Sequence, residues 1–546
     1  MRELRWPGRQ PPDPGDFCVA ELDEEGIYHL VELLGADDRP AWDDVAVVSQ
    51  FRLPTRFPRE VLDEASAFQE PDDAERQGRE DLRDSWCATI DPEDARDHDD
   101  ALSLTPIGRG RSEVGIHIAD VSHYVRPDTA LDREALARGT SCYLPGGVVP
   151  MLPEHLSSEL CSLLPDRDRL AVSVFVTLDS KGELHGVRFA ETVIRSRQRL
   201  DYGRVQAALD GKQPLTAEVQ EPIEGLMELA RALRRRRFAN GALALEVPEV
   251  KAWVDEQGMP VRIERRPHLE SHELIEEFML LANRCVGVEG AARASGLLYR
   301  VHERPHERKL VDLDRMLKTL GLPRPARTDD PAQALQALLR VKLDPPHRRL
   351  LHRLVLRTLP RARYLERDLG HFGLATTQYA HFTSPIRRYP DLHNHRRVKE
   401  WVREQRSAAW DPHALERLAD RCSATEQNAT DAEREGVRVK SLRSLEGRLG
   451  EQASGIITGL IPQGFFVELE DAPVDGFVRP SQWLDDYFLL DPSGVRLVGR
   501  RTRRSFSLGD TVRVTVARVD VPARECDFAL DAPMSRRRVR ARRRHG

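Results

Sequence analysis

The chain has 546 residues, of which 40% are hydrophobic and 32% charged, and its formal net charge at pH 7 is −6. This length predicts about two to four domains, and no apolar run is long enough to cross a bilayer. The first residues lack the apolar core of a signal peptide, and seven dispersed cysteines contain no Cys-x-x-Cys pair. We therefore expect a cytoplasmic protein without a membrane anchor, a zinc site or a disulfide framework.

The first 55 residues contain two strand-like runs, 17–22 and 28–34, around a turn that includes Gly26. This pattern predicts a β-hairpin that is part of a small barrel, because the segment is too short for a complete five-stranded one. Residues 56–84 are polar and contain Pro58 and Pro71. They predict a linker with one helix near residues 59–68.

A dense group of acidic residues lies between the apolar runs 87–90 and 101–104. It predicts a loop or bulge between two buried strands. So many like charges repel one another, and a divalent cation with oxygen ligands is the usual way to neutralise them. The calcium-loop pattern does not fit, because Ala95 stands at a ligand position and no glycine follows. From these residues alone, a solvated acidic loop stays an equal alternative.

The following segment alternates strands and helices. Its apolar patterns predict a strand that begins at Glu113, strands at 171–178 and 184–194, and helices at 216–238, 272–287, within 307–360, and at 413–446. In the helix 272–287 the apolar stripe predicts core packing, so Glu276 and Glu277 are its residues of interest.

From Gly450 onward, short strands with glycine turns predict a small five-stranded β-barrel. Four aromatic residues interleaved with arginines would suit base stacking, and the sequence does not tell which of them are core: Phe465, Phe466, Phe477 and Trp483. Clustered arginines would suit phosphate contacts: Arg500, Arg501, Arg503, Arg504 and the Arg-rich tail 533–546. For the tail, a solvated basic end is an equal alternative.

Two motifs together resemble the ribonuclease II / ribonuclease R (RNB) family. They are the spacing of Asp91, Asp97, Asp99 and Asp100, and the run Thr-Ser-Pro-Ile-Arg-Arg-Tyr-Pro-Asp-Leu at 383–392. Further matches follow in the family's order at 115–122, 143–145, 151–153 and 274–279, so the resemblance extends from about 85 to 440.

The resemblance implies an α+β fold with two main domains. They are an RNB catalytic domain over 85–446, with a mixed sheet and surrounding helices, and an RNA-binding OB domain of the S-one type over 447–532. Residues 1–55 resemble a partial cold-shock OB barrel, at most the end of the second of two that the family carries. A shortened N-terminal region would open the RNA entrance, and RNA anchoring and processivity then do not follow from the family.

The resemblance also implies an activity, namely metal-dependent 3′-to-5′ hydrolysis of single-stranded RNA to nucleoside 5′-monophosphates. The expected cofactor is Mg2+, with Mn2+ as a second candidate, and the expected partner is the 3′ end of RNA. No small-molecule cofactor is expected, and the protein is expected to be a monomer. The chemistry agrees, because two metal ions can stabilise both the attacking and the leaving oxygen.

Carried over by position, the four aspartates and one arginine form the catalytic centre. Asp91, Asp97 and Asp100 are implied as metal ligands, and Asp99 as the acid whose loss most directly stops the reaction. Arg387 would hold the scissile phosphate and stabilise its developing charge. The alternative for Arg387 is an ion pair that closes the core.

The resemblance also assigns RNA contacts. Tyr143 would stack near the 3′ end and limit the product length, and Tyr202 with Glu276 would sense the ribose through its 2′-OH. A core tyrosine is the alternative for Tyr202. Glu433 matches a further family glutamate, and a solvated helix position is its alternative. Arg300 and His302 would line the RNA path.

One departure concerns Leu245, which replaces an aromatic residue of the family that stacks on RNA. Its loss would remove about 1–3 kcal/mol of stacking without affecting the catalytic residues. Two other functions stay open from the sequence: a catalytically inactive RNA-binding protein of the same fold, and a DNA exonuclease. The complete acidic set argues against the inactive protein, because a binder of polyanions gains nothing from clustered carboxylates.

Overall fold

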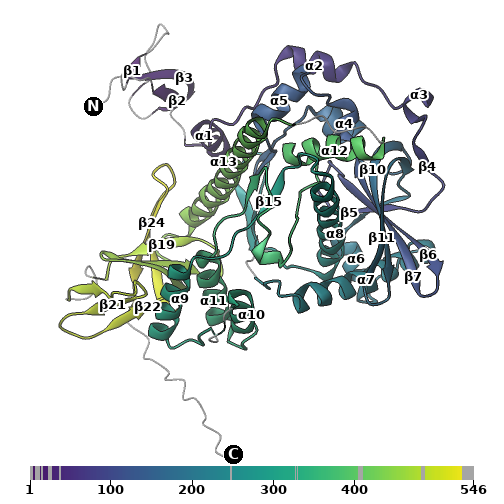
Figure 1. Cartoon of the computed structure of the whole chain (residues 1–546). Helices are drawn as coiled ribbons and strands as arrows, with labels where there is room; N and C mark the ends of the chain where they lie inside the picture. The colour runs from purple at the N-terminus through teal and green to yellow at the C-terminus, as the bar shows by residue number, and fades with distance from the viewer. Residues whose placement is uncertain are drawn as a thin grey trace, which may run out of the picture.

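The computed structural model describes residues 4–5, 13, 16–22, 27–35, 38–245, 249–325, 328, 330–403, 410–480 and 486–531. Trp483 and the Arg-rich tail 533–546 therefore lie outside the described residues. Helices and mixed sheets alternate along the chain, and the fold class is α+β as predicted (Figure 1). Within the described ranges, every helix is too short or too polar to span a bilayer.

The N-terminal part contains a small sheet with strand order β1-β3-β2, which includes the predicted hairpin: β1 (Leu4–Arg5), β2 (Phe17–Leu22) and β3 (Tyr28–Gly35). The helix α1 (Trp42–Gln50) follows and was not predicted. It is held against α13 (Pro412–Leu445) by the fully buried Lys440, which donates to Pro40 O and to Asp43 Oδ2. This contact is too distant in sequence to be seen in the local pattern.

The central sheet has seven strands in the order β12-β5-β6-β7-β10-β11-β4. Their bounds are β4 (Glu80–Leu82), β5 (Ala88–Asp91), β6 (Asp100–Gly108), β7 (Arg111–Ala119), β10 (Asp168–Asp179), β11 (Leu184–Arg195) and β12 (Gln198–Asp201). The two edge strands pair in parallel and the inner strands antiparallel, so the sheet is mixed. The three predicted strands are confirmed, and β7, which begins at Arg111, is followed by a short helix α4 (Val121–Tyr124).

Helices pack on both faces of this sheet, which explains the long apolar runs of its inner strands. Leu102 faces a core shared with α7 (Ala217–Ala239) and α8 (Glu270–Arg293), and its neighbour Ala101 faces a core shared with α2 (Arg59–Ser66) and α5 (Ala130–Arg138). The predicted helices at 59–68, 216–238, 272–287 and 413–446 are confirmed by α2, α7, α8 and α13.

Shorter elements surround the sheet. They are α3 (Asp73–Arg76), the π-helix at His155–Leu160, α6 (Tyr202–Leu209), α12 (Tyr389–Val402), the hairpin of β8 (Cys142–Leu144) and β9 (Gly147–Val149), the hairpin of β13 (Val250–Val254) and β14 (Pro260–Arg265), and the pair β15 (Tyr299–Val301) and β16 (Arg363–Leu365). The predicted helical region 307–360 forms three helices: α9 (Glu307–Leu320), α10 (Pro331–Leu339) and α11 (Pro345–Thr358).

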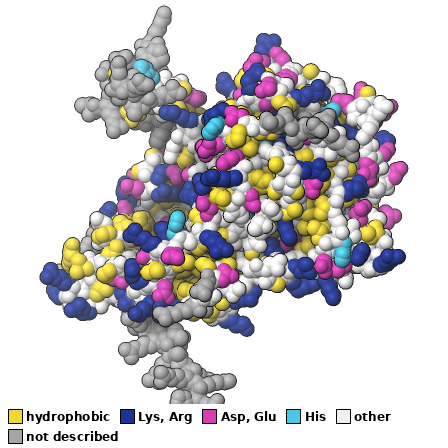
Figure 2. Space-filling view, in the orientation of Figure 1, with side chains coloured by type: hydrophobic (Ala, Val, Ile, Leu, Met, Phe, Trp, Pro, Cys, Tyr) yellow, Lys and Arg dark blue, Asp and Glu magenta, His cyan; other side chains and the backbone are white. Residues whose placement is uncertain are grey.

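The C-terminal part is a closed five-stranded barrel, as predicted: β17 (Gln452–Ile461), β18 (Gly464–Leu469), β19 (Asp475–Val478), β23 (Thr511–Asp520) and β24 (Glu525–Leu530). A three-stranded sheet of β20 (Phe488–Leu490), β21 (Arg496–Gly499) and β22 (Ser505–Ser507) adjoins it. Phe465 is a core residue, whereas Phe466 is 37% exposed beside Phe477 and can contact a ligand. Basic and acidic side chains are interspersed over the face shown in Figure 2, in keeping with the small net charge.

Candidate active site

The acidic loop, residues 92–99, connects the end of β5 to the start of β6, as the sequence predicts. Asp91 is the last residue of β5 and Asp100 the first residue of β6, so the two aspartates flank the loop. The Ala119 N–H of β7 donates to Asp99 O at 2.9 Å and fixes the end of the loop to the sheet. The carboxylates are therefore carried by the rigid centre of the domain.

Asp99 and Arg387 meet although they are 288 positions apart in the printed sequence. The Asp99 Oδ1 atom accepts a hydrogen bond from the Ile386 N–H at 2.9 Å, and its Oδ2 atom lies 3.7 Å from Arg387 Nε. Asp99 is 5% exposed, whereas the Arg387 side chain is 42% exposed. Burial raises the pKa of Asp99 well above its usual range, against the opposing attraction of Arg387. Arg387 is thus free to face a ligand while it stays beside the buried acid.

Asp100 and Asp91 form a second pair of interacting carboxylates. Burial raises the pKa of Asp100 to about 8, and the neighbouring charge of Asp91 adds to the shift. Asp91 Oδ2 is also 2.7 Å from the Nδ1 atom of His98, a buried residue whose backbone N–H donates to Ser162 Oγ. The Asp100 carboxylate, whose charged form is disfavoured by burial, is an oxygen donor that a bound cation would stabilise.

Tyr143 connects the acidic loop to α13. Its hydroxyl donates to Asp97 Oδ2 at 2.9 Å, and its backbone N–H donates to Glu433 Oε1 at 2.8 Å. Glu433 is half-buried, and partial burial raises its pKa, so this glutamate is a bound partner of the β8–β9 hairpin and not a fully solvated helix residue. The Tyr143 ring itself remains 39% exposed, which leaves a face for a ligand.

Tyr202 and Glu276 also lie near Asp91 and Asp100. Asp201 and Asp91 are register partners in the parallel strands β12 and β5, so Tyr202 begins α6 next to the loop. Burial raises the pKa of the Tyr202 hydroxyl, and Asp100, Asp91 and Glu276 raise it further. The ring of His272 stacks on Tyr202 with centroids 4.0 Å apart and planes 17° apart. Tyr202 therefore packs against the core and faces the acids at once.

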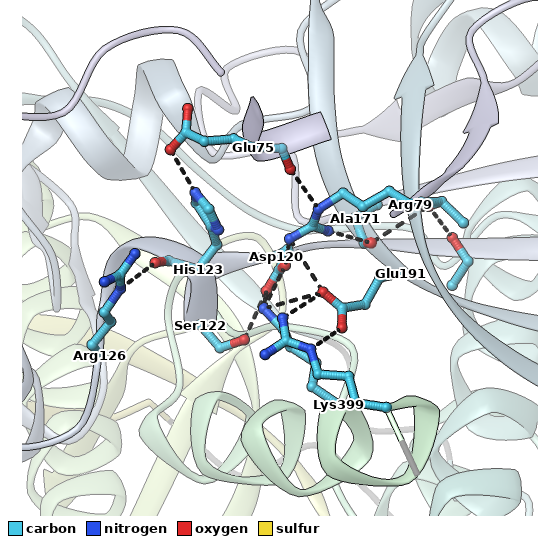
Figure 3. Close-up of polar contacts among 12 residues, drawn as sticks. Glu75, Arg79, Asp120, Ser122, His123, Arg126, Ala171, Glu191 and Lys399 are labelled. Carbon is cyan, nitrogen blue, oxygen red and sulfur yellow. Dashed lines mark hydrogen bonds and ion pairs between the residues drawn. The ribbon is translucent and has the colours of Figure 1, made fainter. Parts of the chain in front are cut away.

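The segment with Arg387 is anchored by α12. The fully buried Asp391 accepts from the Ser384 N–H at 2.9 Å and from Arg388 Nη2 at 2.7 Å. Further along α12, Lys399 donates to both carboxylate oxygens of Asp120, at 3.0 and 2.8 Å (Figure 3). Asp120 directly follows β7, so this ion pair locks the helix to the strand end that also fixes the acidic loop.

The structure does not bring every predicted RNA contact to the acidic loop. Arg300 pairs with Glu426 at 2.5 Å and lies over the ring of Tyr364. His302 is 9% exposed and its Nδ1 accepts from the Gly373 N–H. Leu245 packs beside a hydrophobic core and offers no ring.

Sequence reasoning missed His98, His272 and Lys251, which hold residues of the site. His98 stands inside the acidic motif, and His272 precedes Glu276 by four positions, a spacing that puts two side chains on one face of a helix. The Lys251 Nζ atom donates to Asp94 Oδ2 in the acidic loop, a contact over 157 positions that carries no local signal.

One further acidic cluster was also missed. Across the described ranges, only Asp179, Glu183 and His185 have three ligand atoms within 4.8 Å of one another. They lie at the turn from β10 to β11, where Asp179 Oδ1 accepts the backbone N–H groups of Lys181 and Glu183. These bonds are sufficient to explain the cluster as a capped, solvent-exposed turn.

The fold and the site together define a two-part class of protein: an RNB domain, matched over residues 79–404, followed by an S1 RNA binding domain, matched over residues 447–530. The first match alone covers more than half of the chain. The chain therefore belongs to the RNB family.

Its relatives include the ribonuclease R of Aquifex aeolicus (strain VF5), which is 38% identical over 510 residues that cover 92% of this chain and 72% of that protein. The ribonuclease R of Escherichia coli (strain K12) is 36% identical over 549 residues, 95% of this chain and 67% of that protein. Among solved structures, Mycoplasma genitalium RNase R in complex with ribose methylated single-stranded RNA matches with a TM-score of 0.90 and 27% identity, over 97% of this chain and 85% of that one.

Proposed function

We propose that this chain is a metal-dependent exoribonuclease that hydrolyses single-stranded RNA from the 3′ end and releases nucleoside 5′-monophosphates. Membership of the RNB family and the similarity to ribonuclease R enzymes over most of the chain support this activity. The observation that carries the proposal is the buried Asp99 carboxylate, held by the Ile386 N–H beside a half-exposed Arg387. This arrangement joins an acid that favours a cation to a cation that can bind phosphate.

The acidic residues fit a divalent metal ion. Asp91, Asp97, Asp99 and Asp100 offer only hard oxygen donors, which Mg2+ prefers, with Mn2+ as the second candidate. Burial disfavours the charged forms of Asp99 and Asp100, and a bound cation would reverse that cost. When bound, the metal lowers the pKa of water and stabilises charge on the oxygens of the phosphodiester.

The other residues orient the substrate around this centre. Arg387 would bind a non-bridging oxygen of the scissile phosphate and stabilise the charge that develops there, because its guanidinium is fixed by Ser384 Oγ at 3.0 Å and by the Asp99 carboxylate. Tyr143, fixed at its hydroxyl and its backbone, would stack on a base near the 3′ end. The Tyr202 hydroxyl and Glu276 would bind the ribose 2′-OH, which distinguishes RNA from DNA.

On the barrel of the S1 domain, the half-exposed Phe466 is a candidate stacking residue for the RNA. We further propose that the enzyme acts as a monomer in the cytoplasm without a small-molecule cofactor. Light scattering of the purified chain, with and without RNA, would test the oligomeric state.

The direct test is a time course on a 5′-labelled single-stranded RNA with Mg2+, beside the same reaction with EDTA. The proposal expects products that shorten from the 3′ end in the Mg2+ reaction only. Intact RNA in both reactions, with binding still visible in a gel shift, would instead establish the inactive RNA-binding protein.

That alternative has a structural basis, because the fold alone does not decide catalysis. Yeast Ssd1, described as a pseudonuclease, shares the fold with a TM-score of 0.70 at 20% identity. The four aspartates and Arg387 favour the enzyme. A matched pair of RNA and DNA oligomers would separate an exoribonuclease from a DNA exonuclease, since only the former depends on the 2′-OH.

A further inference from the structure

The hairpin of β13 and β14 has two faces with different surroundings. Its inner face carries Ala252, which is 3% exposed, and packs against α13. Lys251 and Trp253 alternate with Ala252 along β13, and their register partners on β14 are Glu264 and Arg262. Because side chains alternate along a strand, these four residues share the outer face of the hairpin.

The outer face is turned toward the acidic loop. The Lys251 Nζ atom donates to Asp94 Oδ2 at 2.5 Å, while the Asp94 side chain remains 63% exposed. The same Nζ atom lies 5.4 Å from the centroid of the Trp253 ring. The indole of Trp253, a partly exposed residue, therefore lies next to the loop that carries the catalytic acids.

Trp253 is held in a cationic setting. The guanidinium carbon of Arg262 is 4.1 Å from the ring centroid, and the Arg262 side chain is 58% exposed. A cation over an indole is attracted by the ring and limits its motion. Lys251 is neutralised by Asp94, whereas the one acidic partner of Arg262 in the described part of the chain is Glu264 at 3.7 Å, so the exposed guanidinium can bind another anion.

The hairpin also reaches the S1 domain. Arg265 of β14 forms an ion pair with Glu468 of β18, and Arg353 of α11 binds the other oxygen of this carboxylate at 2.7 Å. One hairpin thus contacts both the acidic loop and the RNA-binding barrel.

We propose that the outer face of the β13–β14 hairpin binds single-stranded RNA close to the acidic loop, with one base stacked on Trp253 and a phosphate at Arg262. This inference rests on the proposed function and adds a contact to it. Stacking on an indole is independent of base identity, and an exposed guanidinium recognises the backbone, so the surface suits a nuclease that accepts any sequence.

The test measures the affinity of a short fluorescent single-stranded RNA in the full chain with Asp99→Asn, which prevents cleavage. Trp253→Leu should weaken binding by about 5- to 150-fold, the range for loss of one stacked base, and Trp253→Phe should retain most of the affinity. Arg262→Ala should lower the slope of log K against log salt by about 0.7, the value for one lost phosphate contact on a single strand.

An abasic nucleotide scanned along the RNA sharpens the test. At one position of the RNA, the missing base should weaken binding to the Asp99→Asn chain. The same RNA should bind the chain that also carries Trp253→Leu as tightly as the intact RNA does. The matched control is Trp410→Leu. Trp410 is also partly exposed and also lies beside a guanidinium, that of Arg397 of α12, whose carbon is 4.3 Å from the ring centroid. That control should bind RNA like the parent chain.

Equal binding by the parent chain and Trp253→Leu, or an equal loss in Trp410→Leu, would overturn the inference. Binding of an acidic peptide that competes with RNA at Trp253, with no abasic position that matters, would also overturn it. The proposed function fails separately, if the chain with Asp99 intact leaves RNA whole in Mg2+.

Discussion

Two buried carboxylates, those of Asp99 and Asp120, differ in their ionic partners. Asp99 and Asp120 are close in the fold, because the residue before Asp120 donates its N–H to Asp99 O. Asp120 is bound by Lys399 and by Arg79 Nη2 at 2.6 Å (Figure 3), and these cations outweigh burial and hold its pKa well below its usual range. Among the described residues, the one cation paired with Asp99 is Arg387 at 3.7 Å, and burial raises the pKa of Asp99.

The difference shows that burial alone does not identify a functional acid. A carboxylate with two short ionic bonds is electrostatically complete, and it serves to lock elements together. A carboxylate whose charged form is disfavoured in the folded chain can be stabilised by a further cation. Such a free-energy cost is typical of the place where a reaction occurs. The comparison can be tested by changes in each group.

The largest effect is expected for Asp99→Asn, which removes the incomplete carboxylate and keeps its shape. Its kcat on single-stranded RNA should fall on the order of 10³-fold, because the charge that holds the metal and the reacting groups is lost. The RNA affinity should change little, and the melting temperature in EDTA should stay level or rise, because a buried carboxylate whose charged form is disfavoured is replaced by a neutral amide. Single-turnover kinetics, a binding assay and calorimetry measure these three quantities.

A matched control for this change is Glu93→Gln in the same loop, since the Glu93 side chain is exposed. It should hydrolyse RNA at close to the parent rate. A comparable loss of kcat in both variants would mean that the loop as a whole, and not Asp99, supports the reaction.

Asp120→Ala, at the carboxylate that already has two cationic partners, should instead affect stability. It should lower the free energy of unfolding by roughly 3–5 kcal/mol, because Lys399 is left buried without its main partner. Chemical denaturation measures the change. The double variant Asp120→Leu with Lys399→Met should recover part of the loss, and a double variant less stable than the single one would contradict this account.

A smaller effect is expected from metal binding, which should depend on the acidic loop and not on the exposed cluster at the β10–β11 turn. A divalent ion at 100 times its Kd stabilises the folded chain by about 2.7 kcal/mol, so Mg2+ should raise the melting temperature of the parent chain. The shift should be lost in Asp100→Asn and kept in Glu183→Gln, which changes the exposed cluster at the β10–β11 turn. Loss of the shift only in Glu183→Gln would move the metal site to that turn.

Much of the fold follows from local sequence patterns. The inner strands are apolar on both faces, and the long helices have regular apolar stripes, so their places were predicted closely. Helix α1 was missed, because its stability depends on a buried ion pair with Lys440, near the other end of the chain. Tertiary contacts of this kind leave no periodic signal in the segment itself.

The candidate site shows the same limit. The acidic loop is visible in the sequence, because its charges and flanking strands are adjacent. The partner of Asp99 is known only once α12 is placed, and the contact of Lys251 with Asp94 depends on a hairpin 157 positions away. Glu433 illustrates the ambiguity of a charged helix: the sequence allows a solvated residue, whereas in the fold Glu433 is half-buried and accepts a hydrogen bond from the Tyr143 N–H.

The smallest effect is expected for His272→Ala, which tests whether Tyr202 depends on a neighbour for its position. The His272 ring is fixed by the Leu269 N–H, which donates to Nδ1 at 3.2 Å, and it stacks on Tyr202. Loss of an aromatic pair costs about 0.5–1.5 kcal/mol, so the preference in kcat/KM for RNA over matched DNA should fall by about 2- to 12-fold.

His272→Phe keeps the ring and should restore the preference, whereas a general loss of packing would lower the rates on RNA and DNA alike. The ratio of the two rates therefore distinguishes a positioning role from a structural one. An unchanged ratio in His272→Ala would show that Tyr202 is held by the core alone, and that the stacked histidine has no part in the recognition of ribose.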